Sequence, residues 1–131
     1  MPFEYTKDDV RRRIKIVGRD PISTSDLMAH IDRQVADGAW TYGVLYDARA
    51  TSNPPSAAEM PQMAAYVQKI AAQHGARGPV AIVTRESATV AVAHIYSVLG
   101  KRAGFRAEVF WDIDEAERWL DARDAEAKGM A

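Results

Sequence analysis

The residues of this chain best suited to chemistry stand at the ends of three apolar runs, 40–46, 79–84 and 105–111. The first two runs have a composition typical of a buried strand, and the third alternates in polarity as a strand does. In an open α/β sheet the carboxyl ends of parallel strands meet at one edge, and ligands bind there. We therefore expect the side chains at these three ends to form a ligand-binding site. The candidates are Tyr46, Asp47, Arg49, Thr84, Arg85 and Trp111.

Asp47 is the candidate with the most reactive side chain. A carboxylate at a strand end can act as a general base, a metal ligand or a phosphoacceptor. The simpler interpretation, which we favour, is a carboxylate bonded to the amides of its own loop. Tyr46 and Trp111 offer apolar walls beside it, and Arg49 and Arg85 offer positive charge for an anion.

Composition excludes several classes of function. The 131 residues carry 17 basic and 18 acidic side chains, so no overall positive field attracts nucleic acid or an anionic membrane. The absence of cysteine excludes disulfides, thiolate metal sites and thiol nucleophiles. The sequence has neither a glycine-rich phosphate loop nor a G-x-S-x-G elbow. We predict a non-enzymatic protein with no cofactor, no metal site, no catalytic residue and no nucleic-acid partner.

The three histidines lie on three different predicted helices, without a second ligand at a metal-binding spacing. His30 stands four residues after Asp26, which is typical of a pair on a helix surface. His94 stands among alanine and valine residues, so we expect it to be half-buried with its hydrogen bonds satisfied.

The alternation of strand-like and helical patterns positions these residues. Segments 3–6 and 10–17 alternate in polarity and predict an antiparallel hairpin. Helical stripes and apolar runs then alternate, which predicts parallel strands with right-handed crossovers. The predicted fold class is α/β, in the order β-β-α-β-α-β-α-β-α, with a mixed, mostly parallel sheet of about five strands and about four helices. We place one domain at 1–123 and a frayed tail at 124–131.

Local signals set the helix boundaries. Segment 21–26 can cap the first helix, and Gly38 can end it. Segment 48–55 is the strongest loop signal, and Ser56 can cap the second helix, with Pro61 in its first turn. The third helix begins at 87 and ends at Gly100 or Gly104. Its expected core face consists of Val90, Ala91, Ile95, Val98 and Leu99.

Three segments of the chain resemble the SpoIIAA-like family. They are YGVLYDARA (42–50), RGPVAIVT (77–84) and AEVFWDIDEAERWLDA (107–122), and the resemblance extends over residues 3–123. It implies a STAS-type fold. Relatives of this fold act as anti-sigma-factor antagonists, and a distant relationship to lipid-binding CRAL-TRIO proteins has been suggested.

The phosphorylation site of those antagonists is not reproduced here. They carry Asp-Ser-Ser-Gly at the start of the helix after the central strand, whereas this chain matches that motif only at Asp47. Because the motif is missing, the resemblance supports the fold more than the phosphoswitch. Hydroxyls nearby remain candidates for modification. These candidates are Thr51, Ser52 and Ser56.

Three hypotheses follow for the function. The first is a binding or regulatory module that takes a small apolar or anionic ligand, lipid-like in one version, or a regulatory protein at the loops after the central strands. The second is a partner-switching protein controlled by phosphorylation in segment 51–56. The third is a small hydrolase or isomerase that uses Asp47 or Glu86 as its base.

We also expect a cytoplasmic, bacterial-type protein with no transmembrane segment, and a homodimer formed through edge strands or the helix that carries Met60 and Met63.

Overall fold

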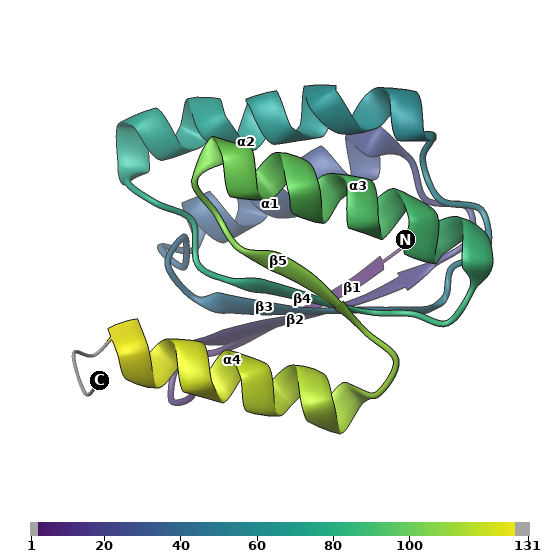
Figure 1. The fold of residues 1–131 in the computed structure, drawn as a ribbon. Coiled ribbons are helices and arrows are strands. Elements are labelled where there is room, and N and C mark those ends of the chain that lie inside the picture. The colour runs from purple at the N-terminus through teal and green to yellow at the C-terminus, as the bar shows by residue number, and fades with distance from the viewer. Residues whose placement is uncertain (1–2, 128–131) are drawn as a thin grey trace.

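The computed structural model describes residues 3–127 and shows helices on both faces of a five-stranded sheet (Figure 1). The predicted order of elements and the mixed, mostly parallel sheet are confirmed. The strands are β1 (Phe3–Asp8), β2 (Arg13–Arg19), β3 (Gly43–Ala50), β4 (Val80–Val83) and β5 (Ala107–Phe110). The helices are α1 (Thr24–Ala36), α2 (Met60–His74), α3 (Ser87–Ala103) and α4 (Ile113–Ala127), and a short 3-10 helix, η1 (Ala57–Glu59), precedes α2.

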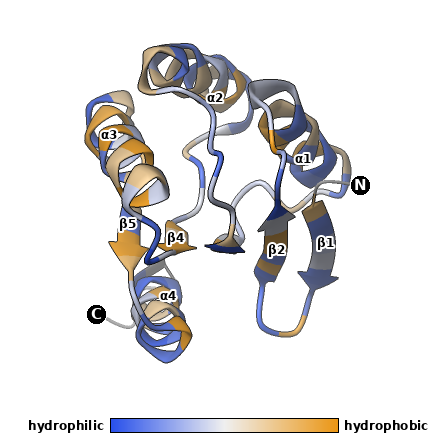
Figure 2. Cartoon of the chain, turned by 90° about the vertical axis from the view of Figure 1, so that its right-hand side faces the viewer, coloured by the Kyte–Doolittle hydropathy of each residue, from blue (hydrophilic) through white to orange (hydrophobic). Residues whose placement is uncertain are grey.

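The strands lie in the sheet in the same order as in the sequence, β1-β2-β3-β4-β5. β1 and β2 are antiparallel, and all other neighbours are parallel. Each parallel strand is added on the same side of the one before it, so right-handed crossovers must place their helices on one face. α1, α2 and α3 do lie over one face, here called the three-helix face, and α4 covers the other, the α4 face (Figure 1, Figure 2).

Alternation along β3 divides its side chains between two cores. Val44, Tyr46 and Ala48 belong to the large core between the sheet and the three helices. Leu45 faces the other way, into a smaller cluster that α4 closes with Ala116 and Leu120. Because side chains alternate along a strand, Asp47 and Arg49 share the α4 face with Leu45.

Strand boundaries differ most from the prediction at the hairpin turn and at the end of β3. β2 begins at residue 13 rather than 10, because residues 9–12 form the turn of the hairpin and Val10 is 94% exposed. The Asp8 carboxylate stabilises this turn by accepting hydrogen bonds of 3.0 Å from the amides of Val10 and Arg11. β3 continues beyond Tyr46 to Ala50, since its register with β2 extends that far.

The capping predictions for α1 and α3 agree with the structure. Ser23 and Asp26 form a capping box at the start of α1, which ends before Gly38. α3 runs through Gly100 and ends before Gly104, whose φ of 89° is a conformation that glycine adopts without strain. α4 continues to Ala127, so residues 124–127 of the predicted tail are helical, and residues 128–131 lie outside the described part of the chain.

The predicted core face of α3 is largely wrong, since of its five residues only Leu99 packs against the large core. The buried residues of this helix are Thr89, Ala93 and Gly100, whereas Ile95 and Val98 are exposed. Small apolar residues surround the helix on nearly all sides, so its periodicity does not single out one face. His94 is also exposed rather than half-buried.

Candidate functional site

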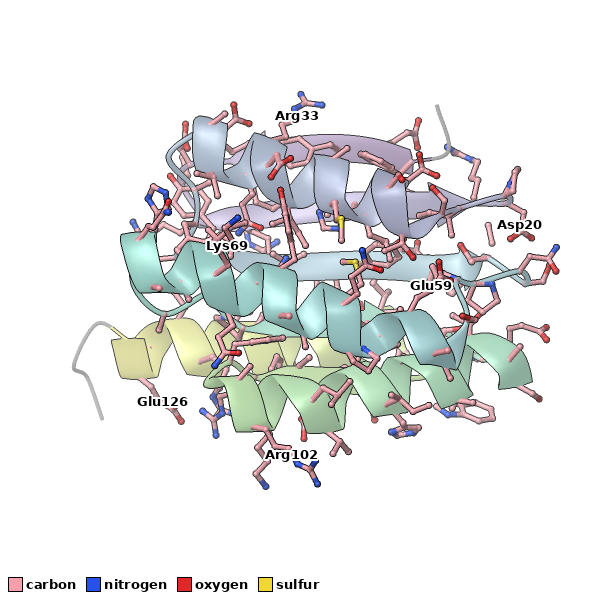
Figure 3. The ribbon with its side chains drawn as sticks, turned by 90° about the horizontal axis from the view of Figure 1, so that it is seen from above. Asp20, Arg33, Glu59, Lys69, Arg102 and Glu126 are labelled. Atoms are coloured by element: carbon pink, nitrogen blue, oxygen red, sulfur yellow. The ribbon has the colours of Figure 1, made fainter. Side chains whose placement is uncertain are left out.

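A cavity of about 90 Å³ lies between the three-helix face of the sheet and the helices above it. Figure 3 looks down on these helices, with α1, α2 and α3 side by side over the sheet. Most of the lining is apolar, and it comes from both layers. The main apolar residues are Val44, Tyr46 and Ala48 of β3, Val80 and Ile82 of β4, Met60 and Met63 of α2, and Val92 and Ala93 of α3.

Two methionines form the contribution of α2 to the cavity. Met60 and Met63 stand three residues apart, which places them on the same face of the helix, and both are buried. Pro61 lies in the first turn of α2, where its missing N–H costs no helical hydrogen bond. Methionine side chains are unbranched and flexible, so this wall can adjust to the shape of a ligand.

The loop after β3 borders the cavity on one side. Thr51, Pro54 and Pro55 line it, and the two prolines are only half-buried. The Oγ1 atom of Thr89 on α3 donates a hydrogen bond of 2.6 Å to the carbonyl oxygen of Thr51. The start of α3 and the loop are therefore joined at the cavity.

Asp20 fixes the same loop from the end of β2. Its carboxylate accepts hydrogen bonds from the amide of Ser52 (3.0 Å), the hydroxyl of Ser52 (2.6 Å) and the amide of Asn53 (2.9 Å). These bonds stabilise the ionised form and lower the pKa of Asp20, with the Ser52 hydroxyl as the largest cause. Asp20 and Glu59 lie at the same end of the helical layer in Figure 3. Glu59 accepts a hydrogen bond of 2.9 Å from the Ser56 amide, which stabilises the other end of the loop.

Four buried polar side chains line the otherwise apolar cavity. They are His30, Thr51, Arg77 and Thr89. The Nδ1 atom of His30, the Oγ1 atom of Thr51 and the Nε atom of Arg77 are each buried without a hydrogen-bond partner among the described residues. Buried polar atoms are nearly always paired in proteins, so unpaired ones on the wall of a cavity indicate places where a polar group can bind.

His30 does not form the predicted surface pair with Asp26. It is buried between the rings of Phe3 and Tyr46, at centroid distances of 5.7 and 5.9 Å. Burial, followed by the positive charge of Arg77, lowers the pKa of His30 to about 3. The imidazole is therefore neutral at physiological pH, and its ring can accept or donate a hydrogen bond according to its tautomer.

The structure separates the sequence-predicted site residues into groups. Tyr46 and Thr51 line the cavity, whereas Asp47 and Arg49 lie on the α4 face. Asp47 accepts hydrogen bonds from Nε and Nη2 of Arg49 at 2.9 and 2.8 Å. These bonds from Arg49 are the main reason that the pKa of Asp47 is lowered.

Two further predicted residues pair with each other at the carboxyl edge of the sheet. The Nε atom of Arg85 donates a hydrogen bond of 3.0 Å to the carbonyl oxygen of Trp111, and its guanidinium lies 6.0 Å from the indole centroid. Both side chains are exposed, with Trp111 at 62%. Thr84 is fully buried, and its Oγ1 accepts a hydrogen bond from the Glu86 amide.

The three candidate hydroxyls for phosphorylation differ in accessibility. Thr51 is buried, whereas Ser52 and Ser56 are exposed. The Ser52 hydroxyl donates to Asp20, and the Ser56 hydroxyl donates to Glu59 at 3.1 Å. Both exposed hydroxyls thus hold carboxylates that stabilise the loop beside the cavity.

Comparison with known proteins gives no relative: no family model, no curated protein and no solved structure matches the chain significantly. The SpoIIAA-like resemblance therefore stays a prediction from the sequence. Residues 3–127 contain no group of three side chains suited to hold a metal ion. None of the helices in this range is long and apolar enough to cross a membrane.

Sequence reasoning missed the two buried ionisable residues of the cavity. His30 had a signal that could have placed it: it lies between Leu27 and Gln34 at helical spacing, next to Ile31, so it shares the inner face of α1. Arg77 had none, because it stands in the loop between α2 and β4, where periodicity carries no information. The spacing of Met60 and Met63 predicts a shared apolar face of their helix, for which packing in the core is the simpler interpretation.

Proposed function

We propose that this chain is a small-molecule-binding module whose ligand occupies the cavity between the sheet and helices α1–α3. The observation that carries the proposal is the combination of an apolar cavity with unpaired buried polar atoms on its wall. Apolar lining with a few polar groups is the usual character of ligand sites, since the former supplies affinity and the latter orientation.

The size of the cavity limits the ligand. Dry apolar cavities of about 150 Å³ take up molecules as large as benzene. A cavity of about 90 Å³ is smaller than this, but the flexible Met60 and Met63 side chains allow it to expand around a linear chain of about six carbon atoms. The ligand is therefore a small molecule rather than a long lipid enclosed along its whole length.

Topology supports a site under the helices rather than at the carboxyl edge of the sheet. Ligands bind at that edge where the strand order reverses, because helices on opposite faces then diverge and leave a crevice. In this sheet the parallel strands follow one another in a single direction, without a reversal. The exposed Arg85–Trp111 pair therefore lies at an edge of the sheet where the strand order creates no crevice for a ligand.

Binding to the native state raises its stability, and this gives a direct test. We expect 1-hexanol to raise the melting temperature of the wild-type protein in a saturable way. Ala93→Leu places a larger side chain in the cavity wall and should remove this response. Ala91→Leu changes an exposed residue of the same helix and should keep it.

Failure of the wild-type protein to respond to neutral probes of this size would contradict the proposal. A response that persists unchanged in Ala93→Leu would place the binding site elsewhere. Ala48→Val fills the cavity from the strand side and provides a second variant if Ala93→Leu does not fold.

A second candidate function rests on the bond between Ser52 and Asp20. A phosphate on the exposed Ser52 hydroxyl would bring negative charge against the Asp20 carboxylate and release the loop beside the cavity. This would support the phosphorylation-controlled alternative. Mass spectrometry of the protein isolated from its native cells tests it: an unmodified segment 51–56 under all growth conditions would contradict it.

The third alternative, a hydrolase or isomerase, has less support. A general base needs a raised pKa in a closed site, and the salt bridge with Arg49 lowers the pKa of Asp47. Glu86 lies exposed at the start of α3.

We also propose that the chain is related to the SpoIIAA-like family, has a regulatory role and forms a homodimer. A cytoplasmic location is proposed as well, and it accords with the absence of cysteine.

A further inference from the structure

Arg77 is a buried cation that has no carboxylate partner among the described residues. Its side chain is 7% exposed, and it lines the cavity. Its Nη1 atom donates to the hydroxyl of Tyr96 at 2.8 Å, and its Nη2 atom to Oε1 of Gln34 at 3.4 Å. Both of these partners are uncharged, and the Nε–H group has none.

Aromatic rings complete the surroundings of this guanidinium. It lies 5.6 Å from the ring centroid of Trp40 and 6.0 Å from that of Phe105. The Trp40 ring is itself fixed, because its Nε1 atom donates a hydrogen bond of 2.7 Å to the carbonyl oxygen of Gly75. Arg77 is therefore held in place by neutral groups that leave its positive charge uncompensated.

An uncompensated buried charge is unusual, because removing a charge from water is costly and proteins normally pair it. His30 offers no counter-charge, because an imidazole is either neutral or positive, and the charge of Arg77 helps to keep it neutral. Arginine presents a planar set of donors that matches a carboxylate. The Arg77 end of the cavity therefore has the charge and the free donor that a small anion requires.

We propose that Arg77 binds the carboxylate of a small amphipathic acid whose apolar chain lies between α2 and the sheet. This inference rests on the proposed function and specifies its ligand class. The neutral His30, whose Nδ1 is unpaired, supplies a second hydrogen-bonding group nearby. One uncompensated cation suits a monoanion better than a phosphate dianion, and the small cavity suits a short chain.

Comparing acids with alcohols of equal chain length distinguishes the role of Arg77 from the more general proposal that the cavity binds small molecules. Binding of butyrate, hexanoate and octanoate is measured by calorimetry at neutral pH, beside the alcohols with the same numbers of carbon atoms. A charge-assisted hydrogen bond in a buried site predicts that the best acid binds on the order of tenfold more tightly than its alcohol. Arg77→Met should remove this preference and leave alcohol binding intact, and Arg77→Lys should retain part of it.

Arg102→Met is the matched control, since it removes an exposed arginine from α3 (Figure 3). Equal binding of acid and alcohol by the wild-type protein would overturn the role of Arg77 while leaving the cavity as a site for neutral ligands. An acid preference that survives in Arg77→Met would also overturn it. If neither acids nor alcohols bind, the proposed function itself fails. If Arg77→Met does not fold, the wild-type preference and Arg77→Lys decide the question.

Discussion

Asp47 and Arg49 stand two residues apart on β3 and form a two-point salt bridge on the α4 face of the sheet. Tyr46, which lies between Ala48 and Val44 on the opposite face, lines the cavity instead. The alternation of side chains along β3 thus separates its one carboxylate from the apolar cavity. This separation predicts which substitutions affect ligand binding.

Asp47→Asn should leave ligand binding in the cavity unchanged. The substitution removes a salt bridge whose arginine is half-exposed, so we expect the free energy of unfolding to fall by about 0.5–1 kcal/mol. Urea unfolding with and without 1-hexanol measures both quantities. Loss of the hexanol response in a folded Asp47→Asn protein would indicate that the ligand binds on the α4 face instead.

His30 should make the protein less stable as the pH falls. Its pKa is about 3 in the folded protein and about 6.5 in the unfolded chain, so the unfolded chain binds more protons between these values. Stability is therefore fully present above about pH 6.5 and decreases below it, with a slope that approaches about 1.4 kcal/mol per pH unit.

Urea unfolding between about pH 7 and pH 5 tests this, because carboxylates titrate mainly below that range. His30→Leu should flatten the profile, whereas His94→Gln, which changes an exposed histidine, should not. Parallel pH profiles of wild-type and His30→Leu proteins would show that the imidazole is not buried in its neutral form.

Asp20 should control the opening of the loop beside the cavity. Asp20→Ala removes the acceptor for the Ser52 and Asn53 amides, so their hydrogen exchange should become several-fold faster. Asp114→Ala, at an exposed carboxylate near the start of α4, should have no such effect. Unchanged protection in Asp20→Ala would mean that the loop is held by Thr89 and its prolines alone.

The same contact has a defined pH dependence. Because hydrogen bonding lowers the pKa of Asp20, its stabilising effect is present above the ordinary aspartate pKa and is lost as pH falls through the lowered value. The chemical shifts of the Ser52 and Asn53 amides should therefore titrate at a pH below the ordinary aspartate range. A midpoint at or above that range would contradict the hydrogen bonds at Asp20.

Sequence patterns were sufficient to predict the order of strands and helices. Apolar residues recur with the period of two expected for strands or the period of 3.6 expected for helices in most segments. The patterns failed at α3, where alanine and valine appear all round the helix and Thr89 and Gly100 take the core positions. They also did not reveal that β3 continues to Ala50, which depends on pairing with β2 rather than on local composition.

The candidate site was only partly accessible from the sequence. Alternation shows that Tyr46 and Asp47 face opposite sides, but which side carries three helices follows from the strand order, which one sequence does not give. Arg77 reaches the cavity through long-range contacts with Tyr96 and Gln34. Contacts between distant segments have no local signature.

The proposed binding function requires that small molecules enter the cavity, and methionine methyl groups provide natural reporters of this. Met60 and Met63 line the cavity, whereas Met28 of α1 packs against the same core without lining it. In a titration with 1-hexanol followed by NMR, we predict saturable shifts of the Met60 and Met63 methyl signals that exceed any shift of Met28, and their loss in Ala93→Leu. Methyl signals that do not saturate, or that shift equally at all three methionines, would contradict the proposal that this cavity is a binding site.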